Sequence, residues 1–468
     1  MEYREKIERY IDSHRQEMIN DICALCRINS EKMSYKEGMP YGEGAYHALE
    51  AALGMAEQYG FSINNYDNYV GPADLIDQEA QLDILAHLDV VPAGEGWKET
   101  EAFEPVEKDG LLFGRGTADD KGPAMAAMYA MRAVKELKIP LKKNVRLMLG
   151  TDEECGSSDI AHYYAVEKEA PMTFSPDGSY PVVNIEKGRL AGNFTAEWTP
   201  DDKLPRIESV QAGIKENVVP GKAFAIVKGL DQEVLEAAME AVEKETGVRF
   251  RLELNDNAME LTAIGSGAHA STPAEGNNAL TGLLTLLDRL EFAPCEQTKM
   301  IHNLLTLFPH GDTRGEALGV AMADELSGEL TMALSMMTIT EKDLSGTFDS
   351  RSPICATDEN MLETIRRNMK AAGMTLHNDS MTPPHHVDGN SHFVKTLLNV
   401  YEEYTGQKGE CIAMGGGTYV HSLKNGVAFG ASMPGTDNRM HGADEFAVID
   451  ELLMSAKMFA QVIVELCS

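Results

Sequence analysis

The sequence predicts an α/β fold of two domains, in which a mixed, mostly parallel sheet with helices on both faces is interrupted by an inserted α+β domain. Apolar runs rich in branched residues alternate with helical segments early in the chain and return near its end. Polar side chains follow several of these runs directly, as at the carboxyl ends of strands in an open sheet. The chain of 468 residues also exceeds the length that one hydrophobic core usually spans.

The first part of the chain has the periodicities of helices and buried strands. Apolar residues at helical spacing predict an amphipathic helix over residues 3–28, and a second helix is expected over 48–59. The short branched run 82–91 predicts a buried strand, and the Ala- and Met-rich segment 122–137 predicts a buried helix. A further strand over 144–154 ends in acidic residues. This order is typical of a parallel sheet with its site at the carboxyl ends of the strands.

From about Lys187 the pattern changes to that of an α+β domain. Strands are expected over residues 189–198, 221–230, 259–267, 330–340 and 345–351. Helices are expected over residues 231–246, 277–290 and 359–373. After Pro383–Pro384 the chain returns to a helix, a strand over 426–431 and a C-terminal helix. We therefore expect one domain formed by residues 1–186 and 383–468, and an inserted domain of residues 187–382.

Composition excludes several classes of partner. The 41 basic and 74 acidic residues give a formal charge of −33, which argues against nucleic acid or an anionic membrane surface as partner.

No segment is long and apolar enough to span a bilayer, and the charged N-terminal sequence has no apolar core of signal-peptide type. Cys23 and Cys26 form the one close pair among seven cysteines and are interpreted as core residues. We expect a cytoplasmic protein.

Histidine and acidic residues gather in the turn-like segments after the predicted strands. His87 and Asp89 are two apart on a strand, so their side chains start on the same face. One of them can bind a metal while the other orients the side chain that binds it. Polar positions on a half-exposed strand are the alternative. Glu153 and Glu154 are adjacent carboxylates that repel each other, unless a metal binds one and leaves the other as a base.

Three further segments are ambiguous when taken singly. Asp119 and Asp120 precede a predicted helix and either bind a metal or cap that helix. The sequence disfavours a phosphate-binding loop there, because no Gly-Lys-Ser/Thr follows and the acidic pair repels phosphate. Asp177 lies in a Pro-Asp-Gly turn, and His441 has no distinctive surroundings of its own.

The joint order and spacing of the motifs resemble the M20 group of metallopeptidases. The resemblance is closest to the bacterial PepV-like dipeptidases of its carnosinase-like branch, and it covers nearly the whole chain. It rests on the motifs HLDVVP, GEGW, GRGTADDKGP, TDEECGSSD, SPDG, GGGTYV and FGASMPGTDNRMHGADE.

The resemblance implies a site for two zinc ions, at which cobalt or manganese can substitute. Asp119 would bridge the two ions. His87 and Asp177 would hold one ion, and Glu154 and His441 the other. Asp89 would orient His87, and Glu153 would be the general base.

The resemblance also implies that the inserted domain is a lid that contributes to the site. Its motifs match at Asn217 in ENVVPGKA, His269 in GSGAHASTPAEGNNA and Arg351 in FDSRSP. His269 would stabilise the oxyanion, although on its own it would be interpreted as a loop or core histidine. Asn217 and Arg351 would hold the substrate, with Arg351 suited to a dipeptide's carboxylate.

The glycine loop before Thr418 has two interpretations. Its backbone amides, at Gly416 and Gly417, either bind the substrate or belong to a tight turn. His421 follows this loop, where the resemblance leads us to expect a smaller or basic residue, and this bears on substrate preference.

The expected function is that of a metal-dependent dipeptidase acting on unblocked dipeptides. A deacylase of the same family, of the succinyl-diaminopimelate desuccinylase or acetylornithine deacetylase type, is the alternative. A binding protein that has lost catalysis is a third hypothesis, which the intact ligand set and Glu153 disfavour. The inserted domain, about 195 residues by the boundaries above, is nearly twice the lid of the dimeric relatives, so a monomer is expected.

Overall fold

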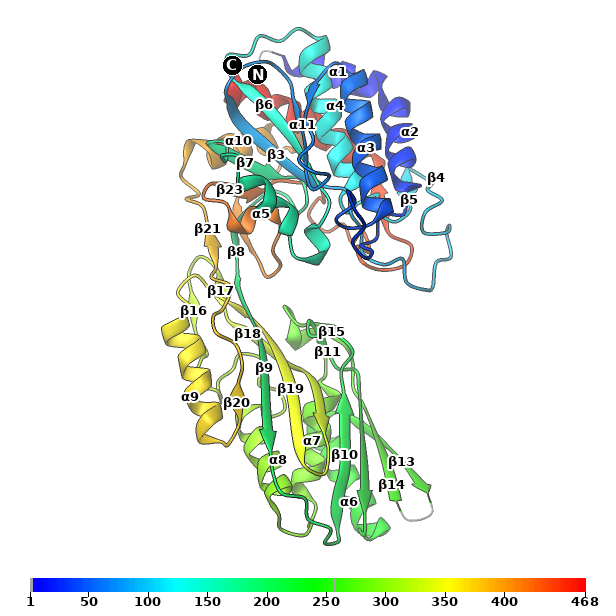
Figure 1. Cartoon of the computed structure of the whole chain (residues 1–468), viewed down its shortest axis with the longest axis vertical. Coiled ribbons are helices and arrows are strands. Elements are labelled where there is room, and N and C mark those ends of the chain that lie inside the picture. Colours follow the sequence, from blue (N-terminus) through cyan, green and yellow to red (C-terminus); the bar gives the residue numbers. More distant parts are fainter. Residues whose placement is uncertain (1–2, 256–257) are drawn as a thin grey trace. The chain divides into compact units, whose positions relative to one another are not determined.

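The computed structural model describes residues 3–255 and 258–468 and divides the chain into two compact units (Figure 1). The first unit comprises Met1–Ile185 and His386–Ser468, and the second comprises Glu186–His385. The second unit is therefore one continuous segment, inserted between two segments that fold together. Among the helices of the described residues, none has the length and apolar character needed to cross a membrane.

A mixed sheet forms the centre of the first unit. The strands along its principal path, in spatial order, are β1 (Ser62–Ile63), β2 (Gly71–Asp74), β6 (Asn144–Gly150), β3 (Ala80–His87), β7 (Met172–Ser175), β23 (Gly426–Ala428), β8 (Val182–Glu186) and β21 (His385–His386). β22 (Cys411–Met414) pairs with β8 beside this path. The four central strands β6, β3, β7 and β23 run parallel, whereas β2 and β8 are antiparallel to their neighbours β6 and β23. The central strands thus end at a common edge, where polar side chains of different segments meet.

Both faces of the central strands are buried, and alternating side chains of β3 pack into two different cores. Leu82 and Ile84 of β3 pack into the main core with α4 (Lys121–Glu136) and α11 (Ile449–Cys467). Leu85 packs on the opposite face, in a smaller core with α5 (Ser158–Tyr164) and the 3₁₀ turn η4 (Tyr419–Ser422). His87 follows Leu85 by two positions and therefore lies on the face covered by α5 and η4.

The N-terminal segment differs from the single helix expected over residues 3–28. It forms α1 (Arg4–Ser13) and α2 (Arg15–Cys26), with the break at His14, whose φ is −103° and ψ is 10°. The His14 ring stacks on Tyr10 with a centroid separation of 4.0 Å, and its Nδ1 lies 2.7 Å from the Tyr10 carbonyl oxygen. The break therefore coincides with contacts between the His14 side chain and the preceding turn. The apolar periodicity of the sequence does not reveal such contacts.

The other elements of the first unit surround this sheet and its core. The helices are α3 (Glu43–Gln58) and α10 (His392–Thr405). The short elements are η1 (Glu153–Cys155) and a three-stranded sheet of β24 (Phe446–Val448), β5 (Leu111–Phe113) and β4 (Val106–Lys108).

The second unit is built on an antiparallel sheet. Its strands, in spatial order, are β13 (Arg249–Asn255), β14 (Ala258–Ile264), β12 (Lys222–Lys228), β10 (Arg206–Ala212), β18 (Thr331–Ile339), β19 (Asp343–Ser352), β9 (Gly188–Glu197) and β20 (Thr375–Leu376). Two short pairs of strands accompany it, β11 (Val218–Val219) with β15 (Ala268–His269), and β16 (Ala323–Asp324) with β17 (Gly328–Glu329).

Four helices contribute to the core of the second unit. They are α6 (Gln232–Thr246), α7 (Ala279–Arg289), α8 (Glu296–Leu307) and α9 (Glu363–Ala371). The Asp231 carboxylate accepts the backbone N–H groups of Glu233 and Val234 and so begins α6, which ends at Gly247 with φ of 72°. Asn278 begins α7 in the same way, by accepting from Leu280 and Thr281.

Candidate metal centre

Five of the residues singled out in the sequence meet in the first unit. His87 ends β3, Asp119 lies just before α4, and Glu154 lies in η1 after β6. Asp177 follows β7, and His441 lies in the loop before β24. They form two groups, His87 with Asp119 and Asp177, and Asp119 with Glu154 and His441. Within each group the possible ligand atoms all lie within 4.8 Å of one another.

Asp119 belongs to both groups and presents a different oxygen to each. Its Oδ1 lies 3.1 Å from Nε2 of His87, and its Oδ2 lies 3.0 Å from Nε2 of His441. Nε2 of His87 is also 3.7 Å from Oδ2 of Asp177, and Nε2 of His441 is 3.3 Å from Oε1 of Glu154. Imidazole nitrogens and carboxylate oxygens are donors that divalent metal ions accept, and each of the two groups could hold such an ion, with Asp119 common to both.

Burial and neighbouring charges shift the pKa values of this cluster in opposite directions. Burial by itself raises the pKa of Asp119, but hydrogen bonds with His441 and His87 bring that pKa below its ordinary value. Hydrogen bonds with Asp119 and Glu154 raise the pKa of His441 to about 10. The cluster therefore favours positive charge beside each oxygen of Asp119, whether from imidazolium groups or from metal ions.

The cluster is enclosed on one side and open on the other. The side chain of His87 is fully buried, whereas that of His441 is 58% exposed. His441 also has a φ of 62°, in the left-handed region that residues other than glycine rarely adopt. A small molecule can therefore approach the cluster from the side of the His441 loop.

Asp89 contacts both His87 and the turn that carries Glu153 and Glu154. Its Oδ1 lies 3.4 Å from Nδ1 of His87, and its backbone oxygen is closer, at 3.0 Å. The two oxygens of its carboxylate accept the backbone N–H groups of Glu153 and Glu154, at 3.2 and 3.1 Å. The buried Asp89 thus fixes the spacing between the imidazole and the two adjacent glutamates.

Glu153 lies beside the two groups without belonging to either. Burial, followed by the negative charge of Asp177, raises the pKa of the Glu153 carboxyl well above its ordinary value. A carboxylate whose pKa is raised is a stronger base than an ordinary glutamate.

Asp120 has a role that the sequence analysis missed. The helix-capping alternative does not hold for it, because its side chain makes no capping hydrogen bond at the start of α4. Its Oδ2 instead accepts the backbone N–H of His87 at 3.1 Å. The buried Asp120 therefore joins the end of β3 to the loop that carries Asp119.

Glu445 and Arg115 were also missed, although both lie in the quoted motifs. Oε1 of Glu445 accepts the backbone N–H groups of Gly116, Ala118 and Asp119, at 2.9, 3.1 and 3.3 Å. Its Oε2 lies 2.5 Å from Nη1 of Arg115. Burial, followed by the charge of Asp119, raises the pKa of Glu445 to about 7. This glutamate holds the loop on which Asp119 depends.

The second unit brings two of its three predicted residues together. Val218 pairs with His269 between β11 and β15, and the N–H of Ala270 donates to the backbone oxygen of Asn217 at 2.9 Å. The His269 side chain is exposed, with Nδ1 2.6 Å from Oγ of Ser271. Arg351 lies in β19, where its buried guanidinium forms an ion pair with Asp349 at 2.9 Å.

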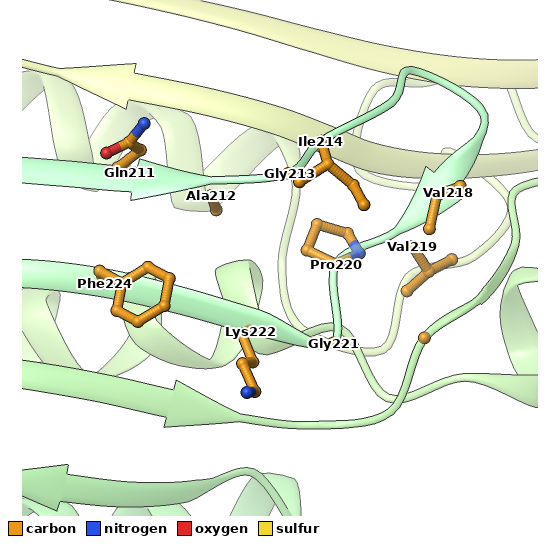
Figure 2. A pocket seen from close by; sticks show the side chains of 11 residues that line it. Gln211, Ala212, Gly213, Ile214, Val218, Val219, Pro220, Gly221, Lys222 and Phe224 are labelled. Carbon is orange, nitrogen blue, oxygen red and sulfur yellow. The ribbon is translucent and has the colours of Figure 1, made fainter. Parts of the chain in front are cut away.

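A cavity of about 540 Å³ lies beside β11 in the second unit (Figure 2). Ile214 and Val218 line one part of it, and Lys222 and Phe224 of β12 line another. Ile214 and Phe224 are both exposed apolar side chains. The lining contains no histidine and no acidic residue, so it lacks the donors of a metal site.

The glycine loop connects β22 to η4 in the first unit. The nearest atoms to a Cβ placed on Gly416 would be those of Met414, at an ordinary contact distance of 3.8 Å, so packing within the protein does not require glycine there. Gly417 is exposed, and Thr418 begins η4 by accepting the N–H of Val420. His421 lies in η4 and is partly buried.

Known proteins are similar to this chain over nearly its whole length. The sequence profile of peptidase family M20/M25/M40 matches residues 84–465. A putative dipeptidase of Bacillus subtilis, YtjP, is 34% identical, and a Beta-Ala-Xaa dipeptidase of Lactobacillus delbrueckii subsp. lactis is 33% identical. Each of these alignments covers 97% of both chains.

Two solved structures share the fold. Human carnosine dipeptidase 1 matches with a TM-score of 0.62 and 14% identity, over 99% of this chain and 98% of that one. The di-peptidase Dug1p from Saccharomyces cerevisiae matches with a TM-score of 0.60 and 13% identity, over 98% of each chain.

Proposed function

Because this chain belongs to peptidase family M20/M25/M40 and is a hydrolase, we propose that it is a metal-dependent dipeptidase that cleaves unblocked dipeptides, β-alanyl dipeptides among them. The two relatives described above are named as dipeptidases, and one of them is named for Beta-Ala-Xaa substrates. The observation that carries the proposal is the pair of donor groups that share Asp119.

The donor set fits two divalent ions, for which we propose zinc, with cobalt or manganese able to replace it. Asp119 would bridge the ions, His87 and Asp177 would hold one, and Glu154 and His441 the other. The division follows the two groups in which these side chains lie. Bound ions would supply Lewis acidity toward the peptide carbonyl group and the attacking water.

Glu153 is proposed as the general base. It would take a proton from the attacking water and pass it to the amine that leaves when the C–N bond of the dipeptide breaks. Its raised pKa supports this role, because a carboxylate with a raised pKa is a stronger base toward the attacking water. Asp89 would keep Glu153 and His87 in register through its contacts with both segments.

The substrate contacts are proposed from the sequence resemblance. His269 would donate to the oxyanion, and Asn217 would hold the substrate beside it, in accordance with the pairing of β11 and β15. Arg351 would bind the terminal carboxylate of the dipeptide, and the amides of Gly416 and Gly417 would bind its backbone.

A substrate panel on metal-reconstituted protein tests this function. We expect turnover of Ala- and β-Ala-dipeptides and little turnover of the same dipeptides carrying an N-acetyl group. Faster hydrolysis of N-succinyl or N-acetyl amino acids would favour the deacylase alternative instead. A metal-loaded protein that cleaves none of these compounds would favour a binding protein without catalysis.

A further inference from the structure

A buried tyrosine–carboxylate contact lies directly behind the turn that carries Glu153 and Glu154. The hydroxyl of Tyr419 donates to Oδ2 of Asp159 at 2.5 Å, and both side chains are buried. The same Oδ2 accepts the backbone N–H groups of Thr151 and Asp152, at 2.6 and 3.0 Å. The Tyr419 oxygen also lies 3.4 Å from the N–H of Asp152. Two side chains thus hold the backbone that enters the glutamate turn.

Gly150 makes this close approach of Tyr419 geometrically possible. A Cβ atom at this position would lie 2.1 Å from the Tyr419 oxygen and 2.7 Å from Oδ2 of Asp159. Any larger residue would displace one of these two side chains. The end of β6 is therefore shaped around the Tyr419–Asp159 contact.

Tyr419 also contacts the imidazole on the neighbouring strand. Its ring lies edge-on to His87, with a centroid separation of 6.2 Å and an interplanar angle of 87°. His87 is paired with Gly150 in the register of β3 and β6. Only Thr418 separates Tyr419 from the last glycine of the glycine loop. The side chain of Tyr419 therefore joins the His87 strand, the glutamate turn and that loop.

A second tyrosine–aspartate bond in the first unit has the same chemistry in a different place. The Tyr129 hydroxyl of α4 donates to Asp21 of α2 at 2.7 Å, and Tyr129 is fully buried. This bond joins two helices and involves none of the residues assigned to the metal centre. Asp21 also accepts the hydroxyl of Tyr59, so Tyr129 offers a comparison for the loss of one buried hydroxyl away from the metal centre.

We propose that Tyr419 and Asp159 are positioning residues, which hold the Thr151–Asp152 backbone so that Glu153 and Glu154 stay in reactive geometry. The proposal rests on the dipeptidase function proposed above. A shift of about 1 Å in a reacting group costs on the order of a hundredfold in rate, so a small relaxation of this backbone lowers turnover more than substrate binding.

The test compares Tyr419→Phe with Tyr129→Phe, since each variant removes one hydroxyl that is bonded to an aspartate. For Tyr419→Phe we expect kcat to fall at least about tenfold while KM stays within about twofold. Hydrogen exchange of the segment that contains Thr151 and Asp152 should be faster, measured without substrate. Tyr129→Phe should leave kcat and this exchange unchanged. Asp159→Asn, which removes the charge but keeps the size, should reproduce the loss in kcat and serves if Tyr419→Phe does not fold.

Three results would overturn the inference. The first is an unchanged kcat in folded Tyr419→Phe. The second is an equal fall in kcat in both tyrosine variants, which would indicate a general effect of lost stability. The third is unchanged hydrogen exchange around Thr151. Failure of the proposed function would look different, because the unaltered protein would then cleave no dipeptide while the exchange comparison would still report on the backbone contact.

Discussion

Arg115 and Glu445, which are 330 positions apart in the sequence, form a buried ion pair in which Nη1 and Oε2 are 2.5 Å apart. The other oxygen of Glu445 accepts three backbone N–H groups from the segment that leads to Asp119. The carboxylate shared by the two donor groups is thus held in place by a contact between the two chain segments that form the first unit.

At pH 8 and above, where Glu445 is ionised because its pKa is about 7, Glu445→Gln should destabilise the protein by about 3–5 kcal/mol, because glutamine leaves the buried guanidinium of Arg115 without a countercharge. The free energy of unfolding from urea titrations measures this effect. Glu79→Gln breaks an exposed ion pair with Lys143 and should cause no measurable change. Equal stability of Glu445→Gln and the unaltered protein would contradict the role assigned to this pair.

Glu153→Gln should abolish most dipeptide turnover, with a fall in kcat of about 10²–10⁴-fold, because the amide cannot accept the proton of the attacking water. Metal content, measured by elemental analysis after dialysis, should stay nearly unchanged. Glu57→Gln, at an exposed position of α3, is the control and should behave as the unaltered protein. If Glu153→Gln also loses metal, then Glu153 is a ligand and its assignment as the base is wrong.

Substitutions in the two donor groups should have unequal effects on metal stoichiometry. Asp119→Asn should weaken the binding of both ions, because Asp119 belongs to both groups. Asp177→Asn and His441→Ala should each weaken the binding of one ion. Zinc titrations followed by calorimetry distinguish these outcomes, with His47→Ala, an exposed histidine, as the control. Equal losses in Asp119→Asn and Asp177→Asn would argue against a bridging carboxylate.

Asp159 should make stability fall as pH rises from about 4 to about 6. Burial raises its pKa from 3.8 to about 6 in the folded protein, so in this range the folded state binds a proton that the unfolded chain has released. The effect amounts to about 3 kcal/mol and is complete above the folded pKa. Urea titrations at several pH values should therefore show a stability difference between Asp159→Asn and the unaltered protein that changes across this window. A difference independent of pH would refute the assignment.

The protein should be a monomer. The long inserted segment motivates this expectation, since the resemblance noted in the sequence associates dimerisation with a shorter lid. Sedimentation equilibrium of a dilute sample should give a mass near 51.2 kDa. A mass near twice this value would show that a second copy takes part.

Elements with strong local patterns could be predicted from the sequence. The apolar run before His87 is β3, the Ala- and Met-rich segment is α4, and the capped helix after Asp231 is α6. The break at His14 was missed, because it depends on the contacts of one ring with the preceding turn and leaves the apolar spacing unchanged.

The residues around the metal centre were harder to predict than the five grouped side chains. His87 could be singled out by its spacing from Asp89 at the end of a predicted strand, whereas His441 was assigned only through the family resemblance. Glu445, Asp120 and Tyr419 act through backbone N–H groups or carboxylates that are far away in the sequence. A single sequence does not show which of these distant positions lie next to each other, so these roles follow only from the folded structure.

The insertion of the second unit also sets an order for the synthesis of the chain. Residues 186–385 form a continuous segment that can fold as soon as it is made, whereas the first unit waits for residues 386–468. At ribosomal rates of about 5–20 residues per second, this segment alone delays the arrival of His441 by about 10–40 seconds. Until then Asp119 lacks both His441 and the Glu445 contact. The nascent chain therefore completes the donor group of Asp119, Glu154 and His441 only after the whole second unit has been made.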